Sequence, residues 1–248
     1  MEQKYTFNEF MDIIRRLRGE NGCPWDRKQT HESLKKYMIE ETYEVIGAVD
    51  RQDVSNLCEE LGDMLLQIAL HTAIAEEGKE FTIEDVIHGV SSKMIYRHPH
   101  VFGNVYAEDE NKVLKNWEEL KKEEKKETMA SESMVRVPIS LPANLRAEKV
   151  QKKALAAGYG HKDFSEVIDH IEKSLFILKQ GKEIGNTTQI NDSYEKLLFL
   201  IVNLSEFLQL NAENSLTNAT NKFINRFVDI ERMSREKGRS LAELSDSE

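Results

Sequence analysis

Residues 53–77 of this 248-residue chain read DVSNLCEELGDMLLQIALHTAIAEE, and this stretch decides the fold class. Its apolar residues recur at intervals of three and four, a period that predicts one long amphipathic helix. Gly78 follows at once and marks the predicted end of that helix. The apolar stripe consists of Val54, Leu57, Cys58, Leu61, Met64, Leu65, Ile68 and Ala75.

The same period continues on both sides of this stretch. Before it, Thr6 and Glu9 form a capping pattern that opens a predicted helix over Phe7–Arg18. No segment shows the alternation of a convincing strand, so we predict an all-α fold. The other predicted helices cover residues 30–49, 83–96, 109–126, 145–157, 164–180, 189–210 and 215–237.

Residues 127–144 separate two helical halves. This segment holds Pro138 and Pro142, three serines and no sustained period, so it is a predicted linker. We therefore predict two tandem helical-bundle domains, residues 1–126 and 145–248. The second reads as a weaker copy of the first, because its helices keep the apolar period but not the acidic residues.

Composition excludes several classes of protein. The net charge of −10 argues against a partner that is a nucleic-acid polymer, because phosphate backbones are bound by clustered lysine and arginine. A small phosphorylated ligand stays possible when metal ions neutralise its phosphates. No apolar run reaches the roughly 18 residues of a membrane span. With two cysteines and no signal-peptide pattern after Met1, we expect a cytoplasmic chain with no membrane partner.

Two pairs of acids stand out on neighbouring predicted helices. Glu41 falls inside an apolar stripe and Glu44 at its edge, while Glu60 and Asp63 repeat the same three-residue spacing. If the two helices pack antiparallel, the four carboxylates meet in one groove and need a cation to neutralise them. Oxygen ligands alone favour Mg²⁺, with Mn²⁺ as a substitute. The stripe around Glu41 consists of Leu34, Met38, Val45 and Ala48.

Each of these signals has a plainer interpretation. A single Glu-x-x-Glu on a helix is usually a solvated face, and it is the pairing on two helices that favours a metal site. Lys93 and Arg97 are four residues apart and could neutralise phosphate oxygens, although basic residues near a helix end are often surface features. Trp117 could stack on a base or fill the core.

Together these residues resemble the MazG family of nucleoside triphosphate pyrophosphohydrolases. The family pattern Glu-Glu-x-x-Glu followed by Glu-x-x-Asp occurs as EETYE at 40–44 and ELGD at 60–63. Further matching segments surround it, and the resemblance covers nearly the whole chain. These segments are NGCPWD at 21–26, RHPHVFG at 97–103, WEELK at 117–121, SLPA at 140–143 and RAEKVQK at 146–152.

The resemblance implies an all-α fold in which antiparallel helices, usually of a homodimer, frame an acidic metal site. It implies hydrolysis of an NTP or dNTP to the monophosphate and pyrophosphate, in nucleotide-pool housekeeping or regulation. By position, Glu41, Glu44, Glu60 and Asp63 would be Mg²⁺ ligands, and Glu40 would orient the attacking water. The candidate nucleotide contacts are Lys93, Arg97, Trp117 and Lys121.

The C-terminal half departs from the family pattern. Of the first acidic run it keeps Glu172 alone, and the second pair is replaced by Ser193 and Lys196. We therefore expect this half to be degenerate, without catalytic metal, and to supply packing surface, a dimer contact or a regulatory site.

Other functions remain open at this point. The main alternative is a non-catalytic helical dimer that senses nucleotides or binds a partner, and a third reading is a purely structural dimer. Among enzymes, a relative specialised for one nucleotide, such as a dUTP or phosphoribosyl-ATP pyrophosphohydrolase, is also compatible with the motifs.

Overall fold

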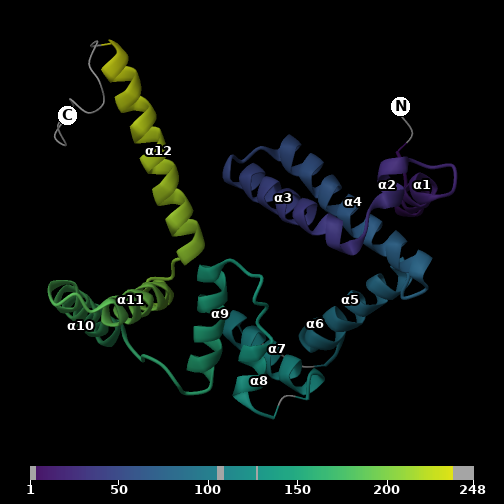
Figure 1. Ribbon diagram of the computed structural model, residues 1–248. Coiled ribbons are helices and arrows are strands. Elements are labelled where there is room, and N and C mark those ends of the chain that lie inside the picture. The colour runs from purple at the N-terminus through teal and green to yellow at the C-terminus, as the bar shows by residue number, and fades with distance from the viewer. Residues whose placement is uncertain (1–3, 105–108, 127, 237–248) are drawn as a thin grey trace. The chain divides into compact units, whose positions relative to one another are not determined.

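The computed structural model describes residues 4–104, 109–126 and 128–236 (Figure 1). Within these ranges every regular element is a helix and no strand occurs, which confirms the predicted all-α fold. The chain divides into two compact units, Met1–Lys121 and Lys122–Glu248. No described helix has both the length and the apolar character that crossing a membrane requires.

The N-terminal unit is built around a hairpin of two long helices. Helix α3 (His31–Asp50) and helix α4 (Val54–Gly78) pack along each other and are joined by residues 51–53 (Figure 1). So short a connection makes the two helices antiparallel. The shorter helices of the unit are α1 (Phe7–Arg18), α2 (Pro24–Lys28), α5 (Ile83–Arg97), α6 (Pro99–Phe102) and most of α7 (Glu110–Glu124).

Side-chain caps fix where the hairpin helices begin. Thr30 accepts a hydrogen bond from the Ser33 backbone N–H at 3.1 Å, and the Ser33 hydroxyl oxygen accepts from the Thr30 N–H at 2.9 Å. Asp53 accepts from the Asn56 N–H at 3.0 Å at the start of α4. These bonds satisfy backbone donors that the first helical turn leaves unpaired.

The core of the N-terminal unit lies at the end of the hairpin opposite the connection. Its buried hairpin residues are Leu34 at the start of α3 and Ala69, Leu70 and Ala73 in the second half of α4. Helix α1 covers them with two fully buried side chains, and the first residue of α5 completes the cluster. These added residues are Met11, Ile14 and Ile83.

A buried arginine attaches α1 to α4 and α2. The Arg18 side chain, 4% exposed, donates from Nε and Nη2 to the two carboxylate oxygens of Glu77 at 2.8 and 2.9 Å. Its Nη1 donates to the backbone carbonyls of Asp26 at 2.6 Å and Gln29 at 3.3 Å. One guanidinium therefore joins three elements that are separate in sequence.

The other half of the hairpin exposes apolar side chains. They follow one stripe on each helix at spacings of three and four, with exposed fractions between 37% and 57%. A solvent-facing stripe of this kind on both helices is typical of a surface that packs against another chain. The residues are Ile39, Tyr43 and Ile46 on α3 and Leu61, Leu65 and Ile68 on α4.

The C-terminal unit repeats the hairpin plan. Helix α10 (Phe164–Glu183) and helix α11 (Thr187–Phe207) are connected by residues 184–186, and Val167, Ile171 and Leu200 form their buried core. The remaining helices of the unit are α8 (Ala130–Val135), α9 (Ala143–Ala156) and α12 (Ala212–Glu236).

The structure adds three short helices to those expected from the sequence. Pro24 and Pro99 each begin a short helix, α2 or α6, at a position where the missing N–H has no helical partner. Helix α8 lies within the predicted linker, and the Glu132 carboxylate accepts from both the N–H and the hydroxyl of Thr128 at 3.1 Å. The predicted end of the last helix, Lys237, lies outside the described residues.

Candidate metal centre

Three carboxylates meet across the α3–α4 hairpin. Glu41 comes from the middle of α3, and Glu60 and Asp63 come from successive turns of α4. One oxygen from each lies within 4.8 Å of the other two, and all three side chains are half-buried. The antiparallel packing brings the groups together, because the three-residue spacing keeps Glu60 and Asp63 on one face of α4.

Two more acids border this group. Glu44, one turn after Glu41, is exposed, and its charge acts on Glu60. Glu40 is also exposed, and its charge acts on Glu41. The structure thus brings together the acids that the sequence singled out, with Glu41, Glu60 and Asp63 as the closest set.

Electrostatics make the group costly without a cation. Burial raises the pKa of Glu41 above its ordinary value, and the charges of Asp63, Glu44 and Glu60 raise it further. Burial likewise raises the pKa of Glu60, followed by the charge of Glu44 and its hydrogen bond. The charges that act on these two groups are all carboxylates, so each opposes the ionisation of the others.

This arrangement fits a hard divalent cation. All the donors are carboxylate oxygens, which Mg²⁺ and Mn²⁺ prefer over nitrogen or sulfur. Because the acids stand on a half-buried surface, water and phosphate oxygens can complete the coordination shell. Mg²⁺ usually keeps such outside ligands when it is held by only a few carboxylates.

The basic and aromatic candidates form a second group around the end of α5. Arg97 is buried, and its guanidinium carbon lies 5.3 Å from the centre of the Trp117 ring on α7. His98 meets the same ring edge-on at 4.9 Å. Lys93, expected to face the same way as Arg97, is exposed, and Lys121 is half-buried.

Lys93 and Arg97 therefore differ in exposure. The Arg97 guanidinium makes a cation–π contact with Trp117, while the Lys93 side chain is exposed to solvent. The carboxylates stand on α3 and α4, whereas this second group stands around the end of α5 and on α7. The candidate residues thus form two clusters.

The C-terminal hairpin offers no equivalent acidic set. Among the described residues of α10 and α11, no three acids come close enough to share an ion. Ser193 is buried, Lys196 is exposed, and both line a surface depression with Ser174 and Asp192. Glu172 is exposed and does not belong to that depression.

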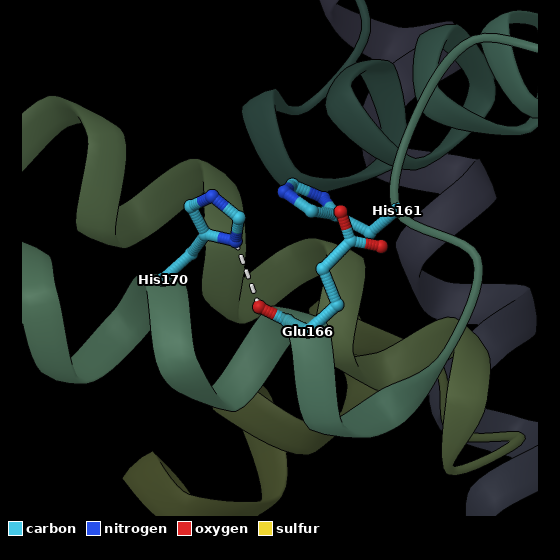
Figure 2. Close-up of side chains that lie close together, drawn as sticks. All are labelled: His161, Glu166 and His170. Atoms are coloured by element: carbon cyan, nitrogen blue, oxygen red, sulfur yellow. Dashed lines mark hydrogen bonds between the residues drawn. The ribbon is translucent and has the colours of Figure 1, made fainter.

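The sequence reasoning missed a further group in this unit. His161, Glu166 and His170 approach one another beside α10 (Figure 2). The four-residue spacing of Glu166 and His170 on a helix was a detectable signal. His161 was not, because it reaches the pair from a loop.

Comparisons with known proteins agree with these features. The model of the MazG nucleotide pyrophosphohydrolase domain matches residues 29–102, which include every acid of the α3–α4 site. MazG of Thermotoga maritima, named nucleoside triphosphate pyrophosphohydrolase/pyrophosphatase, is 42% identical over 243 residues, 98% of this chain and 92% of that protein.

Two more relatives show how far the similarity extends. The nucleoside triphosphate pyrophosphohydrolase of Escherichia coli K12 is 35% identical over 93% of this chain and 89% of that protein. The uncharacterized protein YabN of Bacillus subtilis is 45% identical over 97% of this chain. The chain spans about half of YabN, 49% of its length.

Proposed function

The chain belongs to the MazG family of nucleoside triphosphate pyrophosphohydrolases, and from this premise we propose that it hydrolyses NTPs or dNTPs to the monophosphate and pyrophosphate, with Mg²⁺ as its cofactor. The observation that carries the proposal is the meeting of Glu41, Glu60 and Asp63 within 4.8 Å on two antiparallel helices. We propose that this activity serves nucleotide-pool housekeeping or regulation and that the protein works in the cytoplasm.

In this proposal the carboxylates hold the cation and position water. Glu41, Glu60 and Asp63 bind the ion, with Glu44 completing the set beside Glu60. A Mg²⁺ ion held by these carboxylates would supply positive charge that offsets the phosphate charge and favours ionisation of the attacking water. Glu40, exposed next to Glu41, orients the attacking water.

The second cluster is proposed to receive the nucleotide. The exposed Lys93 and the half-buried Lys121 bind phosphate oxygens, and Trp117 offers a ring face or edge to the base. Arg97 keeps Trp117 in place through its contact at 5.3 Å. Mutation of Lys93 should therefore weaken binding, whereas mutation of Arg97 should disturb the position of Trp117.

We also propose a homodimer formed through the exposed hairpin stripe. Ile39, Tyr43 and Leu65 lie on this surface in the half of the hairpin that carries the carboxylates. A second copy would cover apolar area that water now meets and could bring its own basic cluster to the acids. Leu65→Glu should shift the molar mass in light scattering from dimer to monomer, and an unchanged mass would exclude this interface.

The C-terminal half is proposed to lack catalytic metal. The absence of an acidic set among the described residues of α10 and α11 supports this, as do Ser193 and Lys196 at the positions of the second acidic pair. With its linker at 127–144, this half would supply packing or regulatory surface, and all hydrolysis would belong to residues 1–126.

The test is pyrophosphate release from a panel of NTPs and dNTPs, first with Mg²⁺ and then with Mn²⁺. Wild type and Glu172→Gln should release pyrophosphate, and Glu41→Gln should not. Glu172→Gln is the matched control, because it makes the same change at an exposed glutamate of the C-terminal hairpin.

Either of two results would reject the proposal. Nucleotide binding with no pyrophosphate release under any condition would make the chain a nucleotide sensor. Equal loss of activity in Glu172→Gln and Glu41→Gln would show that catalysis is not confined to the N-terminal acids.

A further inference from the structure

Three side chains of the C-terminal unit converge at the first turns of α10. His161 lies in the loop before the helix, Glu166 in the first turn and His170 one turn later. One ligand atom from each lies within 4.8 Å of the other two, and all three side chains are half-buried. Figure 2 shows the two imidazole rings and the carboxylate gathered above the helix.

The loop before α10 has the backbone needed to bring His161 to this place. Gly158 and Gly160 adopt φ values of 82° and 136°, a region that residues with side chains rarely enter. The ring of His161 then lies 4.7 Å from the ring of His170, with an angle of 57° between the two planes. The pair is tilted, so it is not a simple stack.

Both histidines have a hydrogen bond that orients the ring and selects its tautomer. Nδ1 of His170 lies 2.8 Å from the Glu166 carbonyl, which can only accept, so Nδ1 carries the proton and Nε2 keeps a lone pair. Nδ1 of His161 lies 3.0 Å from Oδ1 of Asn203 on α11, which favours the same tautomer.

The carboxylate is held in the same manner. Oε2 of Glu166 accepts the backbone N–H of Lys162 at 3.0 Å, which leaves its second oxygen available. Each of the three side chains thus has one partner of its own and one lone-pair atom left over. Partners of this kind fix the orientation of metal ligands in proteins.

Other histidines of the chain show which of these features is informative. His98 also bonds to a carbonyl four residues earlier, the Met94 oxygen at 2.6 Å, so that bond alone indicates nothing. His31 and His71 lie with their Nδ1 atoms 2.7 Å apart, but among the described residues no acid joins them in a group of three. What distinguishes the α10 group is the convergence of three oriented ligands.

We propose that His161, Glu166 and His170 bind one Zn²⁺ ion, with water as the fourth ligand. Two imidazoles and a carboxylate are a donor set that zinc accepts, and nitrogen ligands set this site apart from the all-oxygen site of α3 and α4. Zinc bonds of about 2.0–2.1 Å place tetrahedral ligands about 3.4 Å apart. Ligand atoms that now lie within 4.8 Å of one another therefore have to move closer together to bind one ion. The ion would join the loop that carries His161 to α10. It would also connect to α11, because His161 is hydrogen-bonded to Asn203 on that helix.

The experiment measures metal binding by the full-length chain and does not depend on its hydrolytic activity. The chain is stripped with a chelator and titrated with Zn²⁺ against a chromogenic competitor, with Mg²⁺ in large excess to occupy the carboxylate site. Co²⁺ is the second probe, because a tetrahedral site with nitrogen ligands gives it a strong visible absorption. Far-UV circular dichroism checks that each variant keeps its helices.

The variants separate metal ligation from packing. Glu166→Gln keeps the length of the side chain and an acceptor for the Lys162 N–H but removes the charge, and His170→Gln removes an imidazole. His71→Gln is the matched control in a second histidine pair, His31 and His71. Asn203→Ala removes only the partner of His161.

Wild type and His71→Gln should bind one equivalent of Zn²⁺ with equal affinity. Asn203→Ala should weaken binding about 10–100-fold, the usual effect of removing a partner of a ligand, and the two ligand variants should weaken it more. Zinc binding by wild type no tighter than by His170→Gln would overturn the proposal. The proposal would also be overturned if His71→Gln lost Zn²⁺ binding while Glu166→Gln kept full Zn²⁺ binding. Pyrophosphate release in Mg²⁺ should be equal in wild type and His170→Gln, so failure of the catalytic proposal would show in a separate measurement.

Discussion

Replacement of Arg18 by methionine should strongly destabilise the N-terminal unit. Methionine keeps the apolar stem but removes the guanidinium, which donates four hydrogen bonds to Glu77, Asp26 and Gln29. Breaking one partner of a buried charge pair costs roughly 3–5 kcal/mol. Because the Glu77 side chain is 52% exposed and can be hydrated again, we expect the lower end, about 3 kcal/mol.

Arg15→Met is the control for this change. Arg15 also binds both oxygens of a glutamate on α4, Glu76, at 2.8 and 2.9 Å, so the pair has the same chemistry and joins the same helices. The Arg15 side chain is 41% exposed, however, and that of Glu76 is 18% exposed, and a pair that solvent reaches through its arginine contributes about 1 kcal/mol or less. The loss in free energy of unfolding is therefore expected to be about three times larger for Arg18→Met than for Arg15→Met, although the two salt bridges are chemically similar.

Urea unfolding followed by tryptophan fluorescence measures this difference. The two tryptophans, Trp25 and Trp117, both belong to Met1–Lys121, so the signal reports on the N-terminal unit. With a urea slope of about 2 kcal/mol per molar, the midpoint should fall by roughly 1.5 M in Arg18→Met and by 0.5 M or less, roughly, in Arg15→Met. Equal shifts in the two variants would refute the argument that burial decides the strength of these bridges.

Three further predictions follow from the same structure. In metal-free buffer, stability should fall as the pH rises through the raised folded-state pKa of Glu41, and Glu41→Gln should remove part of that fall, as thermal unfolding in a chelator would show. Glu76 should change stability with pH in the opposite direction. Its hydrogen bond with Arg15 lowers the pKa of Glu76, so the stability that Glu76 contributes is present at neutral pH and is lost as the pH falls through that lowered pKa. Arg15→Met should therefore flatten the acid side of a plot of urea midpoint against pH. Thr30→Ala should cost about 1 kcal/mol in the tryptophan-monitored assay by removing the cap of α3, and Thr30→Ser should restore most of it.

Local periodicity was enough to predict the long helices and to single out three acids that lie close together, Glu41, Glu60 and Asp63. The first helix was expected over Phe7–Arg18 and has those bounds, and the MazG family assignment is confirmed by the comparisons. Glu41, Glu60 and Asp63 could be expected to meet, because fixed helical spacings and a short connection leave little freedom in how they pair. Their role as metal ligands stays a prediction.

Features that depend on tertiary packing could not be predicted in the same way. The spacing of Lys93 and Arg97 gives a shared face but not the depth of each side chain, and contact with Trp117 leaves one buried and the other exposed. His161 reaches His170 through a loop with two unusual glycine conformations, and helical periodicity carries no information about such a path.

The position of the core along the α3–α4 hairpin implies a gradient of local stability. The buried core cluster ends near Tyr37 and Leu66, and nearer the connection the described residues of the hairpin add Ala48 as a buried apolar side chain. The stretch that holds Glu41 and Glu60 should therefore open at a lower free energy than the stretch that packs on α1. Amide hydrogens there should exchange with solvent sooner, and a cation or a second copy of the chain should slow that exchange. Binding of a cation or a second copy would therefore stabilise the end of the α3–α4 hairpin that carries Glu41 and Glu60, whereas the main core stabilises the end that packs on α1.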